Sequence, residues 1–230
     1  MNLIYGFLYK KEKQAYYLFR NKKRINLDLY FFLFIKGFFN LFESLIRNIS
    51  GPFGYVIRRY YYKFIFKKMG NDVLIDIGVI FNGPQNIECG NKVWFDSYSI
   101  INIPFSNVKI GSHVHLAAFS YIGGRDCVTI SDNCGVSVGS KIFTGSINIL
   151  TDKNLPILNP MIEESANENG YIHGPVLLEK DACVLSNCVI SPNVTMKKGS
   201  LLLSNSFLIA STEEYGIYSG SPAKLVSKRF

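Results

Sequence analysis

The stretch that decides the fold is VLLEKDACVLSNCVISPNVTMKKGSLLLSNSFL, residues 176–208. A large apolar residue returns at every sixth position without a slip: Leu178, Val184, Ile190, Met196, Leu202 and Leu208. A second column, two residues earlier in each unit, holds only small or β-branched residues: Val176, Ala182, Cys188, Val194, Ser200 and Ser206. Residues two apart on a strand share a face. Each hexapeptide is therefore expected to form one short strand with two side chains pointing inward.

The same columns continue upstream through Ile110, Leu116 and Ile122, and then through Ile130, Val136 and Ile142. A weaker register runs through Ile77, Cys89, Phe95 and Ile101. Residues that tolerate left-handed backbone angles follow many strands, as expected at tight corners: Gly111, Gly123, Asn133, Asn187, Asn193 and Asn205. Three hexapeptides would close one triangular coil, and coils would stack. Residues 71–230 are thus predicted to be an all-β solenoid with a C-terminal cap over 211–230.

Residues 1–70 differ in being aromatic and basic, and they are predicted to be helical. One helix is expected over Leu27–Ile46 and another over about 55–68, separated by Gly51 and Pro52. Asp28, Lys36 and Glu43 interrupt the first helix, which argues against a membrane span. Two interpretations stay open: peripheral contact of residues 27–68 with an anionic membrane, or a helical cap on the solenoid with solvated charges.

The composition limits the partners and the compartment. The net charge of +8 on 230 residues favours an anionic partner, but no nucleic-acid-binding module is recognisable. Five cysteines without a CxxC pair indicate reduced thiols, so we expect a cytoplasmic protein, or one peripheral to the inner face of the membrane. No metal is expected.

Two segments break the repeat. Two residues are inserted at Gly123–Asp126, and a long loop runs over residues 144–175. Solenoids accept insertions on their outside, often at the binding face. A loop of that length within a compact domain is usually functional, so both segments are predicted to border the site.

The repeat resembles that of the hexapeptide-repeat acyltransferases, whose coils form a left-handed parallel β-helix. The end of the chain, GIYSGSPAK from Gly216 to Lys224, resembles the closing motif of maltose- and galactoside-type sugar O-acetyltransferases. Arg58–Tyr61 and His115–Phe119 are similar to stretches of relatives in surface-polysaccharide clusters. The resemblance implies an acetyl-CoA-dependent acetyltransferase acting on a sugar hydroxyl or polysaccharide precursor, and a homotrimer with the donor groove between subunits.

The resemblance also implies site residues. Acetyl-CoA would lie against the coil positions Ser186, Asn187, Ser204 and Asn205, with Lys224 and then Lys228 or Arg229 at its phosphates. Arg125, Asp126 and Trp94 are expected to contact the acceptor. Many relatives carry a catalytic histidine where the long loop opens, but the stretch Thr144–Asn148 has none.

Only three histidines are therefore candidates for the base that takes the proton of the acceptor: His113, His115 and His173. His115 lies between two inward residues, so it should point outward from a rigid strand beside Arg125 and Asp126, and it is the predicted base. His173 is the alternative, acting across a subunit boundary. His113 is expected at a solvated corner.

Three other functions remain open. An N-acetyltransferase acting on a nucleotide-linked amino sugar would use the same scaffold. A zinc hydratase needs three converging histidines, and the spacing of these three does not match that arrangement. A non-catalytic scaffold would bind acetyl-CoA without turnover.

Overall fold

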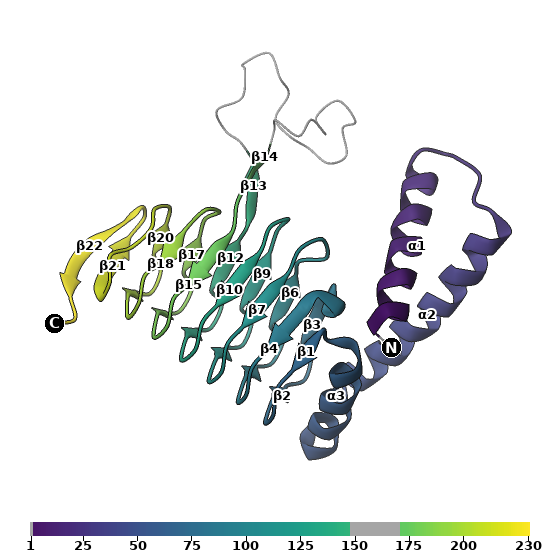
Figure 1. Cartoon of the computed structure of the whole chain (residues 1–230), viewed down its shortest axis with the longest axis horizontal. Coiled ribbons are helices and arrows are strands. Elements are labelled where there is room, and N and C mark those ends of the chain that lie inside the picture. The colour runs from purple at the N-terminus through teal and green to yellow at the C-terminus, as the bar shows by residue number, and fades with distance from the viewer. Residues whose placement is uncertain (1, 148–170) are drawn as a thin grey trace, which may run out of the picture.

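The computed structural model describes residues 2–147 and 171–230, and they form a parallel β-solenoid with helices at its N-terminal end (Figure 1). Three sheets line the solenoid. Sheet A contains β1 (Lys68–Met69), β4 (Ile87–Cys89), β7 (Val108–Ile110), β10 (Val128–Ile130), β15 (Val176–Leu178) and β18 (Thr195–Met196). Sheet B contains β2 (Leu74–Ile75), β5 (Trp94–Phe95), β8 (His115–Leu116), β11 (Gly135–Val136), β16 (Cys183–Val184), β19 (Leu201–Leu202), β21 (Gly216–Gly220) and β22 (Ala223–Lys228). Sheet C contains β3 (Ile80–Asn82), β6 (Ile100–Asn102), β9 (Tyr121–Gly123), β12 (Lys141–Phe143), β17 (Val189–Ile190) and β20 (Phe207–Leu208).

The predicted fold class is confirmed. Each coil contributes one strand to each sheet, and consecutive coils pair in parallel, as β7, β10 and β15 do in sheet A. Both six-residue columns are buried throughout, from Val108 and Ile110 to Ser206 and Leu208. The core is therefore a continuous stack of one large and one small side chain per strand.

Two details of the predicted repeat are wrong. Ile77 lies at a corner, and the inward residues of the first coil are Ile75 and Phe81. The short helix η1 (Pro84–Asn86) lengthens that coil and shifts the count. Neither Gly111 nor Gly123 has a left-handed φ; at Gly111 a Cβ would come within 2.4 Å of the Asp132 carboxylate of the next coil.

Three helices precede the solenoid: α1 (Asn2–Arg20), α2 (Leu27–Arg47) and α3 (Gly51–Ile65). Residues 1–70 were predicted to be helical, with α2 at nearly its observed bounds and α3 a few residues too late, but no bounds were predicted for α1. Pro52 begins α3 instead of only ending α2, because its missing N–H is not needed in the first turn of a helix. Helix α2 is long and apolar enough to cross a membrane by length and composition.

Arg58 joins these helices to the solenoid. Its side chain is buried, its Nε donates to the Ile75 carbonyl at 2.8 Å, and its Nη1 donates to the carbonyls of Ile49 at 2.6 Å and Ile46 at 3.2 Å. It therefore supplies donors to carbonyls at the end of α2 and in the first coil at once.

Replacing Arg58 by Met should lower the free energy of unfolding by about 3 kcal/mol, because several buried carbonyls lose their donor together. Urea unfolding measures this, and Arg59→Met is the matched control on the neighbouring, partly exposed position. Equal midpoints for the two variants would contradict the role of Arg58.

Candidate active site

The outer face of sheet B carries His115. Leu74, Trp94, His115, Gly135, Cys183 and Leu201 follow one another on successive strands of this face. The imidazole stacks on the Trp94 indole, with ring centroids 4.5 Å apart and planes 15° apart. The next strand offers Gly135, which has no side chain. One face of the imidazole is thus covered by an aromatic ring, and the other adjoins open space.

Asp96 partners His115. The Oδ2 atom of Asp96 lies 3.4 Å from Nε2 of His115, while its Oδ1 accepts the Ser97 N–H at 2.6 Å, which fixes the carboxylate at the corner after β5. A neutral imidazole that donates Nε2–H to this carboxylate keeps its lone pair on Nδ1. The His115 side chain is 44% exposed, so that lone pair is available to a substrate. The arrangement is suited to general base catalysis.

Cys183, on the same face beyond Gly135, does not offer a second nucleophile. Burial raises the pKa of its thiol, and only the thiolate is strongly nucleophilic. The chemistry of this face therefore rests on His115.

A second group of candidate residues lies at the corner between sheets C and A. Arg125, Tyr171 and His173 line a cavity of about 510 Å³ together with Phe105, and they also line an adjoining cavity of about 270 Å³. The Arg125 guanidinium lies 4.5 Å from the centroid of the Tyr171 ring. The Nζ atom of Lys13 in α1 lies 3.6 Å from the centroid of the Phe105 ring. The corner therefore combines aromatic rings with positive charge.

Both insertions build this corner. The hairpin of β13 (Gly145–Ile147) and β14 (Tyr171–His173) rises from the end of β12, and the Gly123–Asp126 turn lies one coil earlier. Thr144 joins them, because its Oγ1 accepts the Asp126 N–H at 3.1 Å and its carbonyl accepts the Gly174 N–H at 3.1 Å. Gly124, with φ +141°, must be glycine, since a Cβ would come within 2.2 Å of that hydroxyl.

Asp126 stabilises the backbone of the Gly123–Asp126 turn. Its Oδ1 accepts the N–H of Cys127 at 2.7 Å, so the carboxylate is held in the local backbone. Arg125, in contrast, projects into the cavity that it shares with His173. The two segments that were predicted to border the site thus share one cavity through Arg125 and His173, whereas residues 148–170 of the long loop lie outside the described residues.

The expectation that His115 lies beside Arg125 and Asp126 is wrong. Strand β9 and one corner of the coil separate them, because His115 belongs to sheet B and the insertion follows sheet C. Trp94 instead accompanies His115. The sequence positions are close, but a triangular coil turns through a corner every six residues and carries them to different faces.

The predicted donor positions lie at the corner between sheets B and C. Asn187 and Asn205 have φ of 57° and 60°, and each donates its N–H to the coil before it, to Val138 and to Ser186. The Ser186 hydroxyl lies 3.0 Å from that of Ser137. Their left-handed conformation explains why asparagine occupies these corners. Ser204 is exposed beside Asn205.

Further along the same corner lies an aromatic pair that was not predicted from the sequence. Tyr98 and Phe119 both have φ of 59°, and their rings stack with centroids 5.5 Å apart and planes 5° apart. Both rings are exposed. Bulky residues rarely adopt this strained conformation, which is found most often at functional sites. The sequence did contain a sign of this pair, because Tyr98 and Phe119 are aromatic residues at corner positions where other coils have Gly or Asn.

The C-terminal strand separates the predicted phosphate contacts. Lys224 pairs with Ser219 in β22, and the neighbouring Gly220 donates its N–H to Ser206 at 3.1 Å, so Lys224 lies at the B–C corner. Arg229 donates to the Gly199 carbonyl at the opposite corner, and Lys228 pairs with Glu213 at 2.8 Å. The expectation that these two support Lys224 is wrong, because an extended strand moves them about 3.3 Å per residue away.

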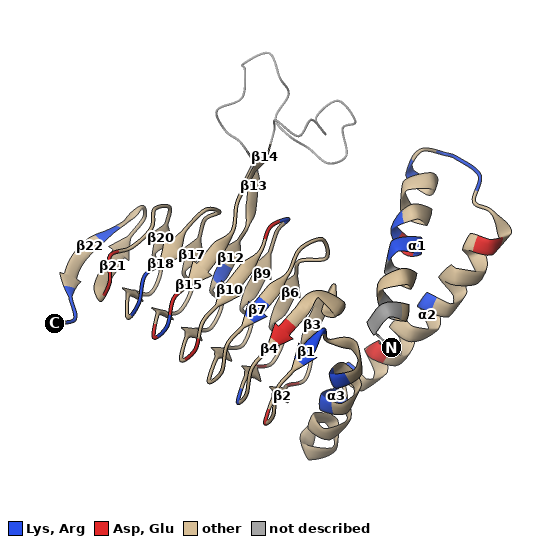
Figure 2. Cartoon of the chain, in the orientation of Figure 1, with Lys and Arg blue, Asp and Glu red and all other residues tan. Residues whose placement is uncertain are grey.

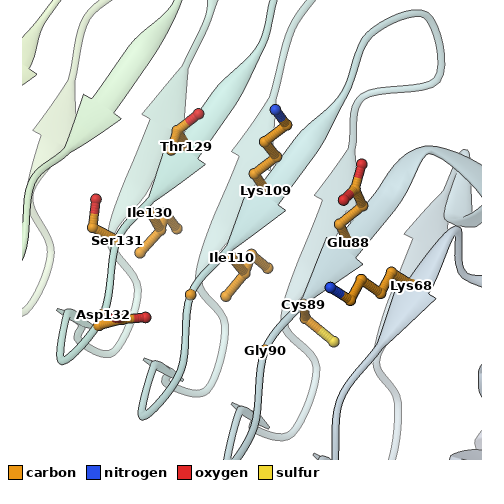
Figure 3. A pocket seen from close by; sticks show the side chains of 11 residues that line it. Lys68, Glu88, Cys89, Gly90, Lys109, Ile110, Thr129, Ile130, Ser131 and Asp132 are labelled. Atoms are coloured by element: carbon orange, nitrogen blue, oxygen red, sulfur yellow. The ribbon is translucent and has the colours of Figure 1, made fainter.

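A shallow groove on sheet A is a less suitable site. Figure 3 shows Lys68, Glu88 and Lys109 projecting from successive strands over this groove of about 400 Å³. Lys67 bonds to Glu88 at 2.6 Å and lowers the pKa of that carboxyl, while burial raises the pKa of the Cys89 thiol to about 12. These groups are paired or protonated, and they offer no base.

Within residues 2–147 and 171–230, no three His, Cys, Asp or Glu side chains are grouped so as to hold a metal ion. The two exposed histidines of interest, His115 and His173, lie on different faces of the coil. The described candidate site therefore consists of an aspartate-supported histidine on sheet B, a serine and asparagine corner between sheets B and C, and a basic aromatic cavity.

The chain is similar in sequence to known acyltransferases. No family model matches the chain. It is 29% identical over 165 residues to the dTDP-4-amino-4,6-dideoxy-D-glucose acyltransferase of Escherichia coli, covering 71% of this chain and 83% of that protein. It is 39% identical over 123 residues to a probable macrolide acetyltransferase of Lysinibacillus sphaericus, covering 49% of this chain and 64% of the relative.

A solved structure shares the fold. AntD, an N-acyltransferase from Bacillus cereus crystallised with dTDP and 3-hydroxybutyryl-CoA, superposes with a TM-score of 0.66 at 24% identity, covering 75% of this chain and 88% of AntD. The six-residue repeat, the parallel solenoid and the likeness to these enzymes agree with one another. Together they support a hexapeptide-repeat acyltransferase, the family that the repeat resembles.

Proposed function

We propose that the chain transfers an acyl group from acyl-CoA to the amine of a nucleotide-linked amino sugar. The support is the likeness to a dTDP-amino-sugar acyltransferase over most of both chains, and a fold shared with an N-acyltransferase that binds dTDP and an acyl-CoA. This replaces O-acetylation of a surface polysaccharide as the preferred interpretation, and N-acylation was the alternative that the sequence left open.

The observation on this chain that carries the proposal is the corner cavity. Its guanidinium, Arg125, suits a diphosphate, because Arg binds phosphate oxygens through two parallel N–H donors. Its rings, Phe105 and Tyr171, suit a flat nucleobase. Lys13, whose Nζ lies 3.6 Å from the centroid of the Phe105 ring, adds positive charge beside the cavity, and its pKa is lowered mainly by burial.

His115 acts as the base in this proposal. The amine nitrogen attacks the thioester carbonyl, a C–N bond forms, and the C–S bond of the donor breaks. Nδ1 of His115 accepts the proton that the nitrogen loses and then passes it to the departing CoA sulfur. Asp96 stabilises the imidazolium that forms in between, as a charged hydrogen bond does in a partly water-excluded site. His173 would bind the acceptor.

The donor is proposed to follow the B–C corner, where Ser186, Asn187, Ser204 and Asn205 form a row of exposed or partly exposed positions one coil apart. The Tyr98–Phe119 pair stands on the same corner in earlier coils. Lys224 lies at its C-terminal end, where a cation would meet the phosphates of CoA.

Lys224→Ala should raise KM for acyl-CoA about 10-fold while kcat changes little, because a charge that holds ground state and transition state alike affects only binding. Steady-state kinetics at saturating acceptor measure this. Lys228→Ala removes the same charge four residues later, where Glu213 pairs with it, and should leave KM unchanged. An unchanged KM in Lys224→Ala would assign that lysine to the surface.

We also propose that the chain works as a homotrimer. His115 and the Arg125 cavity lie on different faces of one coil, so a single acceptor reaches both only if the cavity of one subunit meets sheet B of the next. Cyclic assemblies present two different faces of each subunit to each other in this way.

Product analysis tests the reaction. Acetyl-CoA and longer acyl-CoAs are incubated with nucleotide-linked sugars that carry an amine, and with matched sugars that carry a hydroxyl at the same position. Mass spectrometry should show an acylated amino sugar, and the product should resist mild alkali because it is an amide. An alkali-labile product formed equally well from the hydroxyl sugars would support O-acylation instead.

A further inference from the structure

Helix α2 is turned with two of its charged side chains toward the protein. Lys36 and Glu43, which interrupt its apolar sequence, are each only 4% exposed, whereas Asp28 in its first turn is exposed. Lys36 donates to Asn40 and its Nζ lies 3.9 Å from Glu12 of α1, while Glu43 accepts the Tyr62 hydroxyl of α3 at 2.9 Å. The two charges in the middle of α2 are therefore satisfied inside the helical layer.

The opposite side of α2 is aromatic and open. Eight large apolar side chains are exposed there, with Phe34 at 77% and Phe38 at 66%: Leu27, Tyr30, Phe31, Phe34, Phe38, Leu41, Phe42 and Leu45. Their spacing of three and four residues places them on one stripe, about 27 Å long at 1.5 Å per residue. A continuous exposed apolar surface of this size usually marks an interaction site. We therefore expect this aromatic stripe to be covered by an apolar partner.

Charge distinguishes between the possible partners. Residues 1–70 hold 14 Lys and Arg against 3 Asp and Glu, a net charge of +11, whereas residues 71–230 hold 11 against 14. Arg20, Lys22, Lys23 and Arg24 lie exposed between α1 and α2, at the blue end of the helical hairpin in Figure 2. A second copy of this segment would bring like charges together, but an anionic lipid surface would be attracted.

A groove beside the stripe fits the same partner. It has a volume of about 700 Å³ and is lined by Leu27, Asp28 and aromatic residues of α2 and by Lys11 of α1, whose Nζ lies 5.5 Å from the ring centroids of Phe7 and Phe32. Its mainly apolar walls suit an acyl chain, while Lys11 and Asp28 contribute one cation and one carboxylate, so the attraction for anionic headgroups comes from the other cations of residues 1–70. Helix α1 carries Lys10, Lys11, Glu12 and Lys13 in its middle, so the hairpin is suited to lie on a bilayer rather than to cross it.

We propose that the α1–α2 hairpin docks this protein on an anionic membrane surface. The aromatic stripe enters the boundary between headgroups and acyl chains, and the cations of residues 20–24 bind the headgroups. The aromatic stripe itself is distinct from the proposed active site, since sheet B, the B–C corner and the Arg125 cavity carry the candidate catalytic, donor and acceptor residues; of the hairpin, only Lys13 of α1 lies at that cavity, against Phe105. The solenoid is then held beside the bilayer with its site in water.

Vesicle flotation of the full chain tests the proposal. We expect binding to phosphatidylcholine vesicles that contain about a third phosphatidylglycerol, and little binding to phosphatidylcholine alone. Phe34→Glu with Phe38→Glu should abolish binding. Replacing Arg20, Lys22, Lys23 and Arg24 by Gln should weaken it about 10²- to 10³-fold, at about 1 kcal/mol per cation. Phe230→Glu, an equally exposed ring at the other end of the chain, is the control and should bind as wild type.

Unfolding curves and turnover of soluble substrates should be unchanged in the Phe34→Glu, Phe38→Glu variant, which separates docking from folding and catalysis. The proposal is overturned if the wild type binds neither vesicle, or if the double variant still binds. It is also overturned if this variant changes the oligomeric mass instead, which would assign the stripe to a second copy. Retention in the bilayer after alkaline carbonate would show that α2 spans it.

Discussion

His115→Ala should lower kcat/KM by about 10²- to 10⁴-fold while the fold remains intact, the range expected for the loss of a general base. The side chain projects from a strand whose neighbours on both sides are fixed by parallel pairing, so its removal should not disturb the core. Steady-state kinetics measure the loss of turnover, and urea unfolding shows that the fold remains intact.

Two further variants sharpen this result. His113→Asn, at an exposed corner with φ of 58°, is the matched control, because Asn tolerates that conformation and activity should be retained. Gly135→Val fills the open space beside the imidazole with a residue that strands favour, so activity should fall without loss of stability. Full turnover in His115→Ala combined with loss in His173→Ala would reverse the two roles.

The fold followed from the sequence because every hexapeptide obeys the same steric rule. Val184, Ile190 and Met196 are inward for the same reason, and one uninterrupted run of them sets the register of the whole stack. The first coil deviated at Ile77, where η1 adds residues that no periodicity announces. Helix α1 falls in the segment that was predicted to be helical, but its bounds were not predicted, because its first turn holds no acidic residue that would mark its start.

The site was predictable only in part, because a solenoid site joins residues from different coils. His115 was correctly expected to face outward, but its partners Asp96 and Trp94 lie one coil earlier, and their proximity depends on coils of unequal length. Phe105 and Tyr171 meet Arg125 only because the two insertions share one corner. Such contacts depend on three-dimensional register, which local spacing does not encode.

Mixing two inactive variants should restore activity if the proposed trimer is right. His115→Ala removes the base from sheet B, and Arg125→Ala removes the diphosphate contact from the corner cavity. If each active site takes sheet B from one subunit and the cavity from the next, random mixed trimers contain about one intact site in four. Coexpression of the two variants should therefore give about a quarter of wild-type turnover, far above either variant alone.

The matched control pairs His115→Ala with Asp96→Asn. Both changes fall on the same half of the site, so no mixed trimer can assemble an intact one and turnover should stay at the level of the variants. Native mass spectrometry establishes that mixed trimers have formed. If they form and the His115→Ala, Arg125→Ala pair still recovers nothing, then both residues act within one chain. The corner cavity would then have to reach His115 around β9, a path that the triangular coil does not provide, and Arg125 would lose its proposed role at the acceptor.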